Sequence, residues 1–238
     1  MVASRLAKRL HYYELSTYEE YFKLVTEHKG HEDEFQVLVN ILTTNETYFF
    51  REPKHFDFLR EQVLKSWRGT DFKVWSAASS SGEEAYTLAM VLAETLSSRQ
   101  WEVFGSDIST RVLDIANSGI YMMDRLENMD KALLNKYCLR GVRSLEGFLR
   151  ISDALKQRTR FAQMNLMQPL PKSMLAHYDV VFLLNVLIYF DASTKKSVVE
   201  RVISALKPGG YFFISHSESL HRITDQLEMI KPSIFIKK

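Results

Sequence analysis

The chain has a single cysteine, Cys138, among its 238 residues. One cysteine excludes an intrachain disulfide and a cysteine-rich zinc site. The seven histidines include no H-E-x-x-H pattern, so we expect no metal. A basic-then-apolar leader is missing, as is any apolar run of about 18 residues, and we therefore expect a cytoplasmic protein without membrane insertion.

An excess of charge of one sign is also missing. Lysine and arginine number 31 against 29 acidic residues, which leaves a net charge of +2. So small an excess creates no field that would attract nucleic acid, and we expect no nucleic-acid partner. Apolar residues make up 46% of the chain and charged residues 25%, as in ordinary globular proteins. Nothing in this composition demands more than a monomer.

Hydrophobic periodicity divides the chain in two. Residues 1–60 carry apolar side chains at near-helical intervals, which predicts a small N-terminal helical domain and a linker. Residues 61–238 alternate apolar strands with amphipathic helices. The expected strands are 72–77, 103–107, 161–164, 178–184, 211–215 and a last edge strand at 233–236, and the expected helices are 83–96, 193–206 and one that starts at Ser109. This alternation predicts an α/β fold with a doubly wound, mostly parallel sheet, and glycine turns within about 137–160 predict a small antiparallel β insertion.

The segment Val74–Glu84 combines a buried strand, a turn of small residues and a helix with acids in its first turn. Small side chains at such a turn let a ligand lie close to the backbone. The turn lacks the G-x-G-x-x-G spacing of dinucleotide sites, and its carboxylates would repel a pyrophosphate. It suits a cationic, hydroxyl-rich cofactor, and S-adenosylmethionine is such a molecule.

Four polar residues stand where expected strands end: Glu84, Asp107, Asn165 and Asn185. In open α/β sheets, ligands bind at the carboxyl ends of the strands. Asp107 lies roughly 25 residues beyond the turn, close to the spacing of acids that bind ribose hydroxyls. The alternative for Asp107 is a helix N-cap, but a single ligand cradle explains all four positions together.

Five segments resemble the CheR family, the chemotaxis receptor methyltransferases. They are Thr43–Glu52, Trp75–Glu84, Ser106–Ile108, Asn185–Asp191 and His216–Ser219, in the family's order along the chain. The resemblance implies methyl transfer from S-adenosylmethionine to receptor glutamates, with S-adenosylhomocysteine as product. It also implies cytoplasmic receptor helices as partners, and for some members a receptor C-terminal tail peptide that docks on the insertion.

The resemblance further implies roles for particular residues. The cofactor-contacting set would be Asn45, Thr47, Arg51, Glu84, Asp107, Asn165, Leu166, Asn185 and Val186. Within it, Glu84 would take the methionine ammonium, Asp107 the ribose hydroxyls, and Asn165 with Leu166 the adenine. Arg51 and Tyr189 would face the acceptor carboxylate as catalytic residues. The alternatives are helix capping for Asn45 and Thr47, a surface cation for Arg51 and a core aromatic for Tyr189.

The proposed acceptor needs no general base. A glutamate side chain has a pKa near 4.3 and is ionised at neutral pH, so positioning and removal of water remain the difficult steps. His216 follows an expected strand, but a structural histidine is the favoured interpretation. Arg5, Lys8 and Arg9 share one side of the first helix and form either a solvated face or a surface for acidic receptor helices.

Two departures from the family keep other functions open. Leu183 and Leu184 stand where the family usually has cysteine and arginine, and the N-terminal helical domain is shorter than in the family. A catalytically altered module that binds S-adenosylmethionine or S-adenosylhomocysteine is one alternative. A methyltransferase that acts on another protein or on a small acid is the other.

Overall fold

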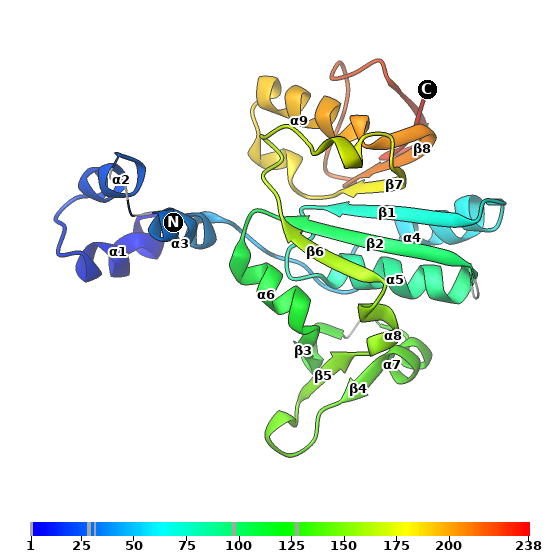
Figure 1. The fold of residues 1–238 in the computed structure, drawn as a ribbon, viewed down its shortest axis with the longest axis horizontal. Coiled ribbons are helices and arrows are strands. Elements are labelled where there is room, and N and C mark those ends of the chain that lie inside the picture. Colours follow the sequence, from blue (N-terminus) through cyan, green and yellow to red (C-terminus); the bar gives the residue numbers. More distant parts are fainter. Residues whose placement is uncertain (1, 28–29, 31, 97–98, 127–128) are drawn as a thin grey trace.

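The computed structural model describes residues 2–27, 30, 32–96, 99–126 and 129–238 (Figure 1). The helices are α1 (Val2–Tyr12), α2 (Tyr18–Glu27), α3 (Glu32–Leu42), α4 (Pro53–Phe58), α5 (Glu83–Leu96), α6 (Thr110–Ser118), α7 (Lys131–Tyr137), α8 (Asp153–Lys156) and α9 (Ala192–Ser204), with a π-helix η1 (Leu59–Leu64) after α4. The strands are β1 (Asp71–Ala77), β2 (Gln100–Asp107), β3 (Ile120–Met122), β4 (Cys138–Arg140), β5 (Phe148–Ile151), β6 (Thr159–Gln163), β7 (Tyr178–Leu183), β8 (Leu206–Ile214), β9 (Leu227–Lys231) and β10 (Ile234–Lys237).

The main sheet has seven strands in the order β6-β2-β1-β7-β8-β10-β9. The neighbouring strands β6, β2, β1, β7 and β8 run parallel to one another, whereas β10 runs antiparallel to both of its neighbours. The order of the strands reverses between β1 and β7, which is where open α/β sheets bind their ligands. This arrangement confirms the predicted doubly wound, mostly parallel sheet.

Helices cover both faces of the sheet because the central strands are apolar on both sides. In β7, Val180 and Phe182 pack into the layer that contains α4, η1 and α5. The alternate residues Val181 and Leu183 pack into the layer under α9. A continuous apolar run is therefore what a strand in the middle of this sheet requires.

The helices α1, α2 and α3 form a separate small domain beyond the carboxyl ends of β1 and β2 (Figure 1). Its core consists of Leu6, Tyr21, Val25 and Leu38. It is joined to the main sheet through α3, where the side chain of Asn40 bonds Ser109 and Thr110. This junction places the linker after α3 directly over the ends of the central strands.

The basic side chains of α1 are not all exposed on one shared surface. The Arg5 guanidinium lies 3.3–3.4 Å from carbonyl oxygens of residues 41–43 at the end of α3. Arg9 pairs with the buried Glu34 at 2.5 Å, and Lys8 is exposed. Two of the three residues are thus engaged within the helical domain, and the three-residue receptor surface stays a prediction.

Replacing Arg9 with alanine is expected to destabilise the helical domain by about 2–3 kcal/mol, because the partner carboxylate stays buried without its cation. Burial raises the pKa of Glu34, but hydrogen bonds from Arg9 and Tyr21 outweigh it and hold the pKa below its ordinary value. Hydrogen exchange of the α1–α3 amides measures the loss. Lys8→Ala is the matched control on the same helix, and equal effects of the two variants would contradict the assignment.

Four details of the chain path depart from the expectations. The helix expected to end at Leu206 ends at Ser204, and the stretch 207–210 lies inside β8, where the β7–β8 register shifts. The last strand, β10, is not an edge strand, because β9 pairs with its outer side. The small sheet, in the order β3-β5-β4, begins at Ile120 rather than near 137. Pro53 starts α4, as its fixed φ allows at a first helical position.

None of the helices in the described part of the chain has the length and apolar character that crossing a bilayer requires.

Candidate active site

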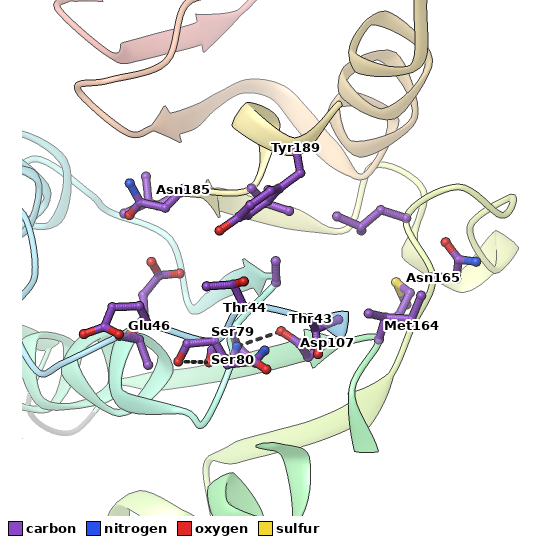
Figure 2. Close-up of a pocket in the computed structure, with 18 of the residues that line it drawn as sticks. Thr43, Thr44, Glu46, Ser79, Ser80, Asp107, Met164, Asn165, Asn185 and Tyr189 are labelled. Atoms are coloured by element: carbon purple, nitrogen blue, oxygen red, sulfur yellow. Dashed lines mark hydrogen bonds between the residues drawn. The ribbon is translucent and has the colours of Figure 1, made fainter. Parts of the chain in front are cut away.

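A cavity of about 460 Å³ lies between the linker after α3 and the carboxyl ends of β1, β2 and β7 (Figure 2). Its volume is within the range of small-molecule sites. All residues predicted for cofactor or acceptor line it: Asn45, Thr47, Arg51, Glu84, Asp107, Asn165, Leu166, Asn185, Val186 and Tyr189. Residues from five separate segments of the sequence thus meet in one site.

The loop between β1 and α5 is built for close approach of its backbone. Ala78 and Ser80 have φ of 64° and 50°, in the left-handed region. Gly82 has a φ of 95°, and a Cβ there would lie 2.8 Å from Cβ of Ala116, so a larger residue would have to displace α6. The Ser80 amide donates to Asp107 Oδ2 at 2.9 Å, which fixes the loop against β2 (Figure 2).

Asp107 ends β2 and is 7% exposed. Its second oxygen accepts the amide of Ser109 at 3.0 Å, and it is Ser109 that precedes α6 as N-cap. Burial raises the pKa of Asp107, and the amide hydrogen bonds oppose that rise without cancelling it. The carboxylate is therefore held rigidly by the backbone while it lines the cavity, as a ligand for hydroxyl groups must be.

Glu84 lies in the first turn of α5, and Ser76 Oγ donates to its Oε1 at 2.7 Å. Burial raises its pKa to about 7, and the carboxylates of Glu52 and Glu218 add to the rise. Ser76 and Arg51 act in the opposite direction. A carboxyl group in this state gains most from a cationic ligand, because a positive charge would offset the cost of its ionisation.

Asn185 stands immediately after the β7 apolar run, at a φ of 58° that asparagine tolerates better than most residues. Its Nδ2 donates to Ser215 Oγ at 2.7 Å. The carboxylate of Glu218 accepts the amides of Asn185 at 3.2 Å and Leu187 at 2.7 Å. Sequence reasoning did not assign Ser215 or Glu218 a role, although Glu218 belongs to the His216–Ser219 motif.

Tyr189 and Arg51 lie at the open side of the cavity. Tyr189 is 59% exposed, and its hydroxyl points into the cavity (Figure 2), so it is not a core aromatic. Arg51 Nη1 donates to the backbone oxygen of Glu46 at 2.7 Å, and its Cζ lies 5.8 Å from the ring centre of Tyr48. The linker itself therefore holds the guanidinium beside the cavity.

The opposite end of the cavity has a more apolar lining. Met164 and Leu166 line it beyond Asp107, and Asn165 Oδ1 accepts the Met167 amide at 2.9 Å (Figure 2). Leu184, at the position where the family usually has arginine, also lines the cavity. The site thus has an apolar end that suits a planar base and an end rich in carboxylates that suits a cation.

Two family models together match almost the whole chain. The model of the all-alpha domain of CheR methyltransferases matches residues 1–43, and that of their SAM binding domain matches residues 45–236. The chain belongs to the CheR methyltransferase family. Its larger domain is therefore an S-adenosylmethionine-binding domain.

Curated CheR relatives match over most of their length. The chemotaxis protein methyltransferase of Escherichia coli (strain K12) is 40% identical over 225 residues, which cover 94% of this chain and 77% of that protein. The chemotaxis protein methyltransferase of Salmonella typhimurium is 35% identical over 237 residues, which cover 99% of this chain and 81% of that protein. Among solved structures, the CMeT domain of the citrinin polyketide synthase has a TM-score of 0.46 at 11% identity and covers 81% of this chain and 41% of that one.

Proposed function

We propose that the protein transfers the methyl group of S-adenosylmethionine to glutamate side chains of chemotaxis receptors, forming methyl esters and S-adenosylhomocysteine. The observation that carries this proposal is the single cavity in which every residue expected to contact cofactor or acceptor is present. The relatives named above are chemotaxis protein methyltransferases, which supports receptors as the substrate. The partners proposed are cytoplasmic receptor helices, with a receptor tail peptide as a second contact.

The residues fit the proposed cofactor. Asp107 supplies oxygens for the ribose hydroxyls, and Asn165 with Leu166 forms the adenine end. At the other end Glu84 receives the ammonium group, and Asn185 with Val186 lies along the methionine part. Asn45 and Thr47 close the cavity from the linker, which lies over the strand ends. No metal is needed for this cradle.

Bound S-adenosylmethionine supplies a methyl group activated by its sulfonium. The acceptor carboxylate is already ionised, so no residue has to remove a proton. The Arg51 guanidinium orients the carboxylate through paired hydrogen bonds. Tyr189 closes the acceptor side, and the apolar Leu184 and Val186 exclude water from the path of the oxygen. Alignment of this kind contributes roughly 7–11 kcal/mol in favourable systems.

Incubation with methyl-labelled S-adenosylmethionine and receptor cytoplasmic domains tests the proposal. Label that is released by base from receptor glutamates is the expected result. Cofactor binding without transfer to any receptor would instead indicate a regulatory module, for which Leu184 in place of arginine is the supporting observation. Label on another protein or on a small acid would leave the cofactor assignment intact and replace the substrate.

Cofactor affinity is expected to rise about eightfold from pH 6 to pH 7.5, because it follows the ionised fraction of Glu84. The pKa of this carboxyl is raised to about 7 in the empty cavity, so its ionised form grows as the pH rises through that value. Calorimetry with S-adenosylhomocysteine measures the affinity. Glu84→Gln should bind weakly and independently of pH, and a flat wild-type profile would refute this role of Glu84.

A further inference from the structure

The linker that carries Arg51 also carries two residues in a conformation that is unfavourable for their side chains. Phe50 and Glu52 have φ of 57° and 59°. Such left-handed residues other than glycine persist only where surrounding contacts enforce them. Phe49, just before them, is completely buried and anchors one side of the turn. The other side is anchored by the carboxylate of Glu52.

Glu52 bonds the turn that follows β8. Its Oε1 accepts the Ser215 hydroxyl at 2.5 Å. Its Oε2 accepts the His216 amide at 3.1 Å and lies 2.6 Å from His216 Nδ1 and 3.0 Å from His55 Nε2. Burial raises the pKa of Glu52, but these hydrogen bonds outweigh it and hold the pKa well below its ordinary value. The residue therefore remains an anion at physiological pH.

The group Glu52, His55 and His216 does not form a metal site, although its donor atoms lie within 4.8 Å of one another. The two imidazole rings stack with centroids 4.5 Å apart and planes inclined by 15°. Nitrogen lone pairs lie in the ring planes, and nearly parallel stacked rings cannot direct them at one ion. His55 is fully buried against Phe182 and Phe213, so it cannot turn to improve this geometry.

The position of the proton on His55 indicates that Glu52, His55 and His216 have a structural role. His55 Nε2 lies 2.8 Å from the carbonyl oxygen of Ile214 and 3.0 Å from the carboxylate of Glu52. Both are acceptors, so Nε2 carries the hydrogen and is shared between them. His55 thereby links the start of α4 to the end of β8 and fixes Glu52 in place. His216 contacts the same carboxylate, as expected of a hydrogen-bonded structural histidine.

A continuous hydrogen-bond path leads from Glu52 to the opposite wall of the cavity. Ser215 Oγ, which donates to Glu52, also accepts from Asn185 Nδ2 at 2.7 Å. Glu218 accepts the amides of Ser215 at 2.9 Å, Asn185 and Leu187. The turn 215–218 is thus bonded to the linker on one side and to the loop that carries Asn185 and Tyr189 on the other.

We infer that Glu52 is a positioning residue for methyl transfer, which sets the separation between the linker that bears Arg51 and the loop that bears Asn185. This inference rests on the function proposed above. Glu52 supports the proposed methionine and acceptor end of the cavity. Asp107 and Asn165, at the proposed adenosine end, are instead bonded to the amides of Ser80, Ser109 and Met167. Loss of Glu52 should therefore affect ligands according to which end they occupy.

The test compares two ligands on Glu52→Gln. Glutamine keeps the shape of the side chain but has only one oxygen for the donors of Ser215, His55 and His216. Affinity for S-adenosylhomocysteine, which has the amino acid part, and kcat for methyl transfer are each expected to fall about tenfold. Affinity for methylthioadenosine, which lacks that part, should change less than about twofold, since its site is remote from the altered wall.

Two further variants complete the test. Glu61→Gln makes the same chemical change on η1, where the carboxylate is exposed and paired with Lys65, and should leave both affinities unchanged. Ser215→Ala breaks the path at its middle and should reproduce the selective loss, without adding to it in the double variant. The inference is overturned if Glu52→Gln leaves kcat and affinity unchanged, or if it lowers the affinity for both ligands equally. Failure of the wild type to bind S-adenosylhomocysteine would instead overturn the proposed function.

Discussion

Replacement of Asp107 with alanine is expected to weaken S-adenosylhomocysteine binding at least about 100-fold. The carboxylate is 7% exposed and is held by two backbone amides, so it is rigid before the ligand arrives. Two hydrogen bonds from ribose hydroxyls to a charged group contribute about 1.5–3 kcal/mol each, and every 1.4 kcal/mol is about tenfold in affinity. Calorimetry on the wild type and the variant measures the difference.

The control for this change must separate ligand contact from support of the loop. Asp107→Asn keeps one carbonyl oxygen for the Ser80 or Ser109 amide and sets its NH2 group against the other, so it should lose less thermal stability than Asp107→Ala yet still lose most of the affinity. Asp114→Ala, at an exposed position of α6, should leave affinity unchanged. Wild-type affinity in both Asp107 variants would show that the ribose is held elsewhere.

The parallel half of the sheet could be predicted because its strands are locally unambiguous. Within the expected strand 178–184, residues 180–184 form a continuous apolar run, which suits a strand buried on both faces. The antiparallel edge could not, because β9, which forms a tight hairpin with β10, is exposed over most of its length and has no buried apolar pattern. Likewise Lys207–Gly210 has the composition of a helix stop, yet Leu206 and Tyr211 on either side of it pair with β7, and the stretch lies within β8. Tertiary pairing overrides local propensity at such places.

The lining of the cavity could be predicted because polar residues at parallel strand ends meet at one edge. Its supports could not. Glu52 directly follows Arg51, and nothing in its own spacing indicates that it bonds Ser215, which lies 163 residues further along the chain. Arg9 was predicted to face outward because its periodicity matches Lys8 and Arg5, but the buried Glu34 on α3 draws it inward. Pairing of buried charges depends on packing between elements, which periodicity does not contain.

Carboxylates surround the methionine end of the cavity without an equal number of cations. Glu84, Glu52 and Glu218 raise one another's cost of ionisation, and the pKa of Glu84 shows the result. Glu52 and Glu218 are compensated by hydrogen bonds from the 215–218 turn, whereas Glu84 has Ser76 as its donor. A ligand that brings a positive charge completes this arrangement, whereas the carboxylate of Asp107 already has the amides of Ser80 and Ser109 as donors.

Replacement of Arg51 with alanine is expected to lower the methyl-transfer rate at least about 100-fold. In the proposed role, the guanidinium offers paired donors to the acceptor carboxylate at the open side of the cavity, and loss of such a preorganised group costs about two to three orders of magnitude in rate. Arg51→Lys should recover little, because an ammonium lacks the planar fork. Single-turnover rates with saturating cofactor isolate the chemical step from binding.

The rate and affinity of this variant together decide what Arg51 contacts. If Arg51 orients the acceptor, the rate falls while the affinity for S-adenosylhomocysteine changes less than about threefold. The guanidinium then acts on the acceptor in the transition state and not on the bound cofactor. If it instead grips the cofactor carboxylate, affinity falls with the rate and methylthioadenosine binding is spared. Arg60→Ala, which removes an exposed arginine of η1 paired with Asp57, should change neither quantity. A wild-type rate in Arg51→Ala would remove Arg51 from the site and leave Tyr189 as the residue facing the acceptor.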